Sequence, residues 1–166
     1  MAYVSNTATG SAGLFNPVTG HRILDTRNGT GGVTGPVTSG HTVAVQVTGV
    51  GGIPSAGVGA VVFNLTVTQP SAAGYVTAYP DGVSRPLASN LNFAAGETIA
   101  NRVVVPVVDG KVDLYLANAS AQLIVDVSGY FTTAPPPAAA PTSTPRRRSG
   151  SRTPAPEAGC PTAGTP

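Results

Sequence analysis

The sequence carries little charge. Only 10% of its 166 residues are Asp, Glu, Lys or Arg, whereas about a quarter of the residues in an average globular protein are charged. Residues 1–133 carry five basic and six acidic side chains, a net charge of −1, and residues 134–166 carry four Arg and one Glu, a net charge of +3. Because a nucleic-acid-binding module needs a basic face to neutralise phosphates, we expect no nucleic-acid partner for the nearly neutral part.

Cysteine and long apolar runs are also scarce. The single cysteine, Cys160, excludes a disulfide framework within one chain and a zinc site built from several thiolates. No run of about 18 apolar residues is present, so we expect no membrane insertion. The first 15 residues lack the basic and apolar regions of a signal peptide. The two His and the scattered Asp residues lack the spacing of a metal site, and we expect neither a metal nor a cofactor.

The sequence is rich in valine, threonine and glycine in place of charged residues. Branched side chains such as Val and Thr pack well on pleated strands, and Gly, Asn, Asp and Pro favour turns. Apolar residues recur with a period of two in six segments that we predict to be strands: residues 41–48, 59–68, 74–80, 101–108, 111–117 and 122–131. Pro106 indicates an edge strand or a bulge, and Asp109-Gly110 predicts a tight hairpin turn between the strands around Val107 and Val112.

These segments predict the fold class and the domain boundaries. No window shows a sustained 3.6-residue period, so we predict an all-β, sandwich-like domain of seven to nine short strands, with jelly-roll and Ig-like topologies as alternatives. Residues 134–166 hold nine of the 16 prolines and no aromatic residue, Val, Ile, Leu or Met. Such a segment buries too little apolar surface to fold. We therefore assign residues 1–13 to a flexible segment, residues 14–133 to the domain and residues 134–166 to a disordered tail.

The densest charge cluster is HRILDTRNGTGG, residues 21–32, where Arg22, Asp25 and Arg27 lie within six residues. In an extended strand, Asp25 and Arg27 share one face and Arg22 lies on the other. A carboxylate accepts a bidentate hydrogen bond from a guanidinium. We favour a structural salt bridge that ties the first strand to a neighbour. The alternative is a clamp for a sugar or an anion.

A weak internal repeat adds a further polar candidate. Two pairs of segments resemble each other: residues 60–67 with 122–129, and residues 40–44 with 96–100. Two related β-halves packed face to face would explain this pattern. The repeat places Asp126 at the position of Asn64, which predicts a buried polar network in preference to an acid/base pair.

Amides and tyrosines complete the candidate residues. Asn90, Asn92 and Asn101 lie in and after the SNLNF segment. Asn in such loops usually bonds its own backbone, with sugar hydroxyls as the alternative partners. Four of the five tyrosines, Tyr75, Tyr79, Tyr115 and Tyr130, are expected to pack into the core with the hydroxyl at the rim, since a sequence without Trp has few rings for stacking sugars.

Six motifs occur in a fixed order: PVTGHRILDTR (17–27), GGIPSAGVGAVVFNLTVT (51–68), GYVTAYPDG (74–82), SNLNFAAGETIAN (89–101), DGKV (109–112) and DVSGYF (126–131). This ordered combination resembles a β-rich module of secreted and cell-wall-associated proteins of actinobacteria. In that family the module stands beside cell-wall hydrolases, peptidases and other extracellular domains, and no catalytic residues are established for it. The resemblance implies a non-catalytic module with an extracellular or cell-surface location, and it supplies no ligand.

The acidic residues do not form a recognisable catalytic pattern. A glycosidase needs two carboxylates across a cleft, whereas Asp81 and Asp109 lie in predicted turns, and neither His21 nor His41 accompanies a GxSxG motif. We therefore expect no enzyme. The resemblance implies a binding or spacer module at the cell surface, for which we expect a cell-wall glycan or secondary polymer as the partner. One alternative is a homo-oligomeric subunit of a surface or virion-like array, which exposed β-edges permit. The minor alternative is a hydrolase.

Overall fold

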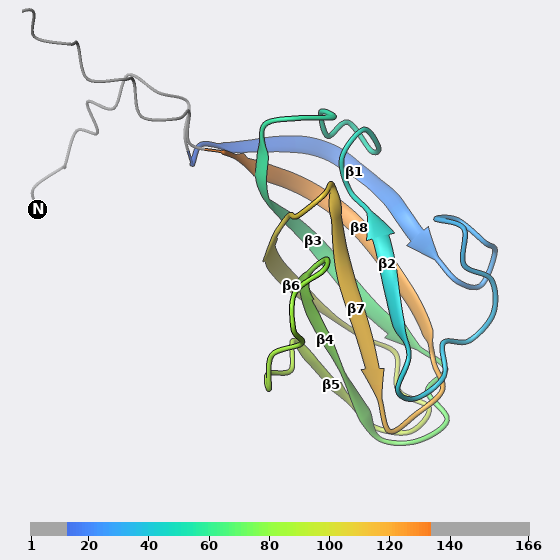
Figure 1. Cartoon of the computed structure of the whole chain (residues 1–166). Helices are drawn as coiled ribbons and strands as arrows, with labels where there is room; N and C mark the ends of the chain where they lie inside the picture. The colour runs from blue at the N-terminus through green and yellow to red at the C-terminus, as the bar shows by residue number, and fades with distance from the viewer. Residues whose placement is uncertain (1–12, 134–166) are drawn as a thin grey trace, which may run out of the picture.

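A computed structural model describes residues 13–133. Eight strands form two four-stranded antiparallel sheets packed as a sandwich (Figure 1), which confirms the predicted all-β sandwich. The strands are β1 (Phe15–Asp25), β2 (Thr42–Gln46), β3 (Val58–Thr68), β4 (Gly74–Pro80), β5 (Leu91–Phe93), β6 (Ile99–Pro106), β7 (Lys111–Ala117) and β8 (Gln122–Thr132).

Some predictions concern residues outside the described range. These are the tail at residues 134–166, which includes Cys160, and most of the N-terminal segment. Among the described residues, no helix has the length and hydropathy to cross a membrane.

The strand order selects one of the two topologies left open by the sequence. The first sheet has the order β1-β8-β3-β6 and the second has the order β2-β7-β4-β5. Each strand of the first half pairs with its counterpart in the second half: β1 with β8, β2 with β7, β3 with β6 and β4 with β5. The chain is therefore a long hairpin, folded at the β4–β5 loop and rolled into two sheets, which is a jelly roll.

The alternating residues form the core between the two sheets. On β3, the four residues that alternate toward one side are fully buried: Val61, Phe63, Leu65 and Val67. The same holds on β7 for Val112, Leu114 and Leu116, and on β8 for Leu123, Val125 and Val127. Burying each such side chain contributes about 1.5–3 kcal/mol before the entropy of ordering is counted. The period-two pattern thus identifies correctly which face of these strands points inward.

The Asp109-Gly110 turn forms as predicted, but the strands it joins do not pair. Both residues have positive φ angles, 49° and 77°, as a type I′ turn requires. Val108 and Lys111 exchange two backbone hydrogen bonds across it. The hairpin ends there, because β6 continues in the first sheet and β7 in the second. Pro106 lacks an N–H group for a longer ladder, and β6 is an edge strand, as Pro106 indicated.

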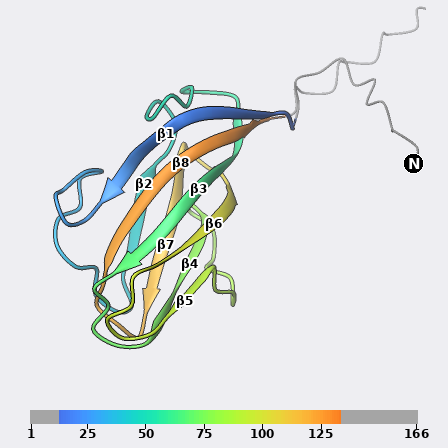
Figure 2. The same ribbon diagram turned by 180° about the vertical axis from the view of Figure 1, so that it is seen from behind.

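The internal repeat does not correspond to two halves facing each other. β3 and β8 contain the more similar pair of segments, yet they are neighbours in one sheet. The prediction of face-to-face halves is wrong for this pair, because the jelly roll inserts β8 between β1 and β3. In consequence Asn64 and Asp126 lie opposite each other on adjacent strands. Both views show β1 and β8 side by side along their length (Figure 1, Figure 2).

Candidate functional site

A β-bulge on β1 positions the charged cluster. Arg22 lies opposite Asp126 on β8 and Leu24 lies opposite Val125, so Ile23 is an extra residue in β1. The extra residue brings Arg22 and Asp25 onto the same side of the sheet, where Arg22 Nη1 donates to Asp25 Oδ2 at 3.1 Å. The expectation that Arg22 and Asp25 lie on opposite faces is therefore wrong. Ile23 is buried in the core.

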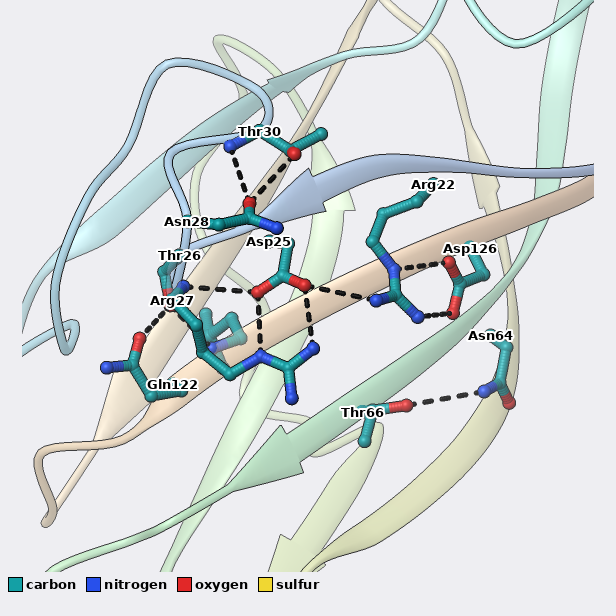
Figure 3. Close-up of polar contacts among 11 residues, drawn as sticks. Arg22, Asp25, Thr26, Arg27, Asn28, Thr30, Asn64, Thr66, Gln122 and Asp126 are labelled. Carbon is teal, nitrogen blue, oxygen red and sulfur yellow. Dashed lines mark hydrogen bonds and ion pairs between the residues drawn. The ribbon is translucent and has the colours of Figure 1, made fainter.

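Asp25 is the centre of the cluster, and its side chain is fully buried. Its carboxylate accepts four hydrogen bonds (Figure 3). Arg27 donates three of them, from Nε to Oδ1 at 2.9 Å, from Nη2 to Oδ2 at 2.7 Å and from the backbone N–H to Oδ1 at 3.1 Å. The bonds from Arg27 lower the pKa of Asp25 from 3.8 to about 2, against the opposing effect of burial.

Arg22 connects this carboxylate to the neighbouring strand. Its Nε and Nη2 donate to the two oxygens of Asp126 at 2.8 and 3.1 Å. The hydrogen bond with Asp126 raises the pKa of Arg22. Asn64 lies next to Asp126 on β3 (Figure 3), but its amide donates to Thr66 Oγ1 at 3.3 Å. The network predicted around Asn64 and Asp126 thus runs instead from Asp126 through Arg22 to Asp25.

Two buried residues beside this cluster were not identified from the sequence. The Thr26 hydroxyl donates to Gln122 Oε1 and accepts the backbone N–H of Leu123 at 3.1 Å. Asn28 Oδ1 accepts both the backbone N–H and the hydroxyl of Thr30 within the glycine-containing turn. No sequence signal marks the Thr26–Gln122 contact, because it joins residues far apart in the chain.

The geometry of the cluster favours a structural role over a ligand clamp. Arg22, Asp25, Arg27 and Asp126 come together at the edge where β1 meets β8. Asp25 has no exposed side-chain surface with which to touch a sugar, and its oxygens already accept four bonds from the chain. We call these four residues the staple.

The asparagine candidates lie away from the staple. Asn90 Oδ1 accepts the backbone N–H of Ala78 at 2.7 Å, and the backbone carbonyl of Asn90 accepts Asn101 Nδ2 at 2.7 Å. Asn90 and Asn101 thus fasten the β4–β5 loop to β6. Asn92 lies on β5, opposite Tyr75 on β4, and its amide has no hydrogen-bond partner within residues 13–133.

Asn92 borders a hollow on the outer face of the second sheet. The hollow measures about 260 Å³, is open to solvent and is lined largely by the β4–β5 loop. Its lining residues are Tyr75, Arg85, Pro86, Leu87, Ala88, Ser89 and Asn92. The guanidinium of Arg85 lies 3.7 Å from the ring centroid of Tyr115. Tyr75 and Tyr115 are half-buried on this outer face, so the expectation that they pack into the core is wrong.

Arg85 was missed by the sequence reasoning because nothing in the turn-rich PDGVSRP segment marks it. Its contact with Tyr115 is created by the jelly roll, which brings the β4–β5 loop over β7.

Two acidic residues, Asp81 and Asp113, lie near this face. The pKa of Asp113 is raised, first by burial and then by the carboxylate of Asp81. In the part of the chain that the structure describes, no group of three or more His, Cys, Asp or Glu residues could hold a metal ion.

No family model, no curated protein and no solved structure matches the chain. The fold, the site geometry and the resemblance of the six sequence motifs are therefore the basis of any functional proposal for this protein.

Proposed function

We propose that this chain is a non-catalytic binding module of the bacterial cell surface, with a cell-wall glycan or an attached secondary polymer as its partner. The observation that carries the proposal is the hollow beside Tyr75, which combines an aromatic ring with side-chain groups that form no hydrogen bond within residues 13–133. Binding sites for small ligands typically have this character, apolar surface with a few convergent polar groups.

The chemistry of the lining residues suits a sugar. One face of a sugar ring carries C–H groups that pack on an aromatic side chain, while its hydroxyls need donors and acceptors around the edge. Tyr75 supplies the ring, and Asn92 and Ser89 supply an amide and a hydroxyl. Eight-stranded jelly rolls also include lectins, but this is an analogy of fold, and function has to be argued from the site.

A pull-down of the full chain on purified actinobacterial cell walls tests this proposal. The walls are used with and without their attached secondary polymers, cellulose serves as an unrelated polysaccharide, and sedimentation velocity gives the oligomeric state. We expect a monomer that is retained by walls and not by cellulose. Loss of retention after polymer removal would identify the polymer as the partner. A monomer that no wall preparation retains would refute the proposal.

One observation favours the alternative of a self-assembling subunit. Apolar side chains are exposed on the outer face of the first sheet, with Phe15 47% and Val104 56% exposed, and the rings of Phe15 and Phe131 are 5.3 Å apart. Apolar surface of this kind can mark a protein–protein contact, and viral capsid subunits also use jelly rolls. Concentration-dependent oligomers without wall binding would favour this alternative.

The pair Asp81 and Asp113 is the observation most relevant to a hydrolase. Two carboxyl groups of which one has a raised pKa occur in general acid catalysis. Neither residue lines the hollow beside Tyr75. The non-catalytic proposal predicts no release of reducing ends from cell walls, and release that disappears in Asp113→Asn would support a hydrolase.

A further inference from the structure

We propose that the hollow beside Tyr75 binds a sugar unit that carries an anionic group, with Arg85 as the anion contact and Tyr75 as the surface under the sugar ring. This inference rests on the proposed glycan-binding function and names the site and the class of ligand. A carboxylate of an acidic sugar and a phosphate of a polyol-phosphate chain share the chemistry that Arg85 would recognise.

Among residues 13–133, Arg85 is the only charged residue that lines the hollow. Within residues 13–133 the ion pairs join Arg22 to Asp25, Arg22 to Asp126 and Arg27 to Asp25, so Arg85 has no carboxylate partner there. A cation at the wall of this hollow favours a ligand of negative charge, because the ligand supplies the counter-charge that residues 13–133 do not.

The stacking of Arg85 on Tyr115 orients its donors. The guanidinium carbon lies 3.7 Å from the ring centroid, a distance at which the cation is attracted to the face of the ring. One planar face of the guanidinium is then occupied, and the N–H groups at its edge stay available. An edge of this kind forms two parallel hydrogen bonds with a carboxylate or a phosphate.

The floor of the hollow suits one sugar ring. Tyr75 and Asn92 are register partners on β4 and β5, so their side chains lie side by side on the outer face of the sheet. The volume of about 260 Å³ falls just below the range of about 300–1,000 Å³ that holds drug-sized ligands. The site thus matches a single unit of a polymer whose neighbouring units extend into solvent.

Two acidic residues near this sheet do not argue against an anionic ligand in the hollow. Asp81 and Asp113 interact with each other, and neither is among the residues that line the hollow. Lys111 also acts on Asp113, where its charge lowers the pKa. The charge that the ligand meets inside the hollow is therefore that of Arg85.

Calorimetric titration of the full chain with three probes tests the inference. The probes are trigalacturonic acid, a glycerol-phosphate oligomer and the neutral triacetylchitotriose. We expect one anionic probe to bind more tightly than the neutral probe, and its affinity to fall as salt is raised. The anionic probe that binds more tightly identifies the source of the anion, carboxylate or phosphate.

Variants assign the binding to the hollow. Arg85→Gln should weaken binding of the anionic probe by about tenfold or more, and Asn92→Ala should weaken it as well. Arg102→Gln is the matched control, since Arg102 is exposed on β6 in the other sheet and has no ion-pair partner among the described residues. It should leave the affinity within about twofold of the wild type. Thermal melts establish that each variant is folded.

Several results would overturn the inference. Equal losses in Arg85→Gln and Arg102→Gln would show attraction to overall charge in place of a site. The site would be ruled out if cell walls retain the chain but neither anionic probe binds. It would also be ruled out if cell walls retain the chain and Arg85→Gln binds the anionic probe as tightly as the wild type. In both cases the proposed function would remain. Failure of the proposed function itself would appear separately, as the absence of retention on any wall preparation.

Discussion

Replacing Asp25 by Asn tests how strongly the staple stabilises the fold. The carboxylate accepts two hydrogen bonds at each of its oxygens, three from Arg27 and one from Arg22. An amide of the same shape keeps one of these oxygens and turns an N–H₂ group toward donors at the other position. The Asp25→Asn variant therefore loses at least two accepted bonds at a fully buried position.

The size of the effect follows from the pKa. The pKa of Asp25 is about 2 in the folded protein and 3.8 without the fold, and at about 1.4 kcal/mol per pH unit the difference corresponds to about 2 kcal/mol in favour of the charged, folded form. Breaking a fully buried ion pair costs about 3–5 kcal/mol. Because the side chains of Arg22 and Arg27 are 43% and 45% exposed and can regain water, we expect a loss of about 2–3 kcal/mol for Asp25→Asn.

The stabilisation by Asp25 also depends on pH with a defined sign. Because the pKa of Asp25 is lower in the folded state, its contribution is complete above pH 3.8 and is lost as the pH falls through about 2. At neutral pH the wild type should therefore exceed Asp25→Asn by the full difference. Near pH 2 only a small part of the difference should remain, because Asp25 is then about half protonated in the folded protein and almost fully protonated in the unfolded chain.

Urea unfolding of both proteins at neutral pH and near pH 2 measures this difference. Asp109→Asn is the matched control, because Asp109 is exposed in a type I′ turn, where Asn-Gly is as favourable as Asp-Gly. It should change the free energy of unfolding by less than about 0.5 kcal/mol. If Asp25→Asn unfolds like this control at neutral pH, or if its loss of stability is equally large near pH 2, the ionised carboxylate of Asp25 does not stabilise the fold.

Two further substitutions on β8 probe the exposed end of the staple and the packing of the strand against β1. Asp126→Asn should cost about 1 kcal/mol or less in urea unfolding, because Asp126 and Arg22 are 34% and 43% exposed, and a loss as large as that of Asp25→Asn would contradict this ranking. Gly129→Ala should cost about 1–3 kcal/mol, because its Cβ would lie 2.7 Å from the backbone oxygen of Asn16 as well as 2.5 Å from ring atoms of Phe15. Gly20→Ala, with nothing within 4 Å of the new Cβ, is its control, and equal melting temperatures for these two glycine variants would refute the close-packing argument.

The inward faces of the strands were predictable because strand geometry is local. Side chains alternate across a strand with a period of two, so a buried residue such as Phe63 can be identified from its neighbours alone. The Asp109-Gly110 turn is likewise determined by the preference of two adjacent residues for positive φ. These features need no knowledge of which strand lies next to which.

The remaining features depend on contacts between distant residues. The bulge at Ile23 exists only relative to the register with β8, so nothing in the HRILDTR segment itself reveals it. The same reason applies to the stacking of Arg85 on Tyr115. Pairing of β6 and β7 was expected from their short connection, but each strand has a better partner in its own sheet. The sandwich was therefore predictable as a class, and the choice of a jelly roll was not.

The arrangement separates the groups that stabilise the fold from those available to a ligand. Arg22, Asp25 and Asp126 of the staple lie on strands of the first sheet, whereas Arg85 and Tyr75 border the outer face of the second. The two sheets pack face to face around the core (Figure 1). Effects of substitutions at separated sites without shared partners usually add. Asp25→Asn should thus lower stability without changing the affinity of the folded protein, and Arg85→Gln should lower affinity with little change in stability. The double variant should show both effects in full, since the four residues of the staple exchange hydrogen bonds with one another and none with the hollow.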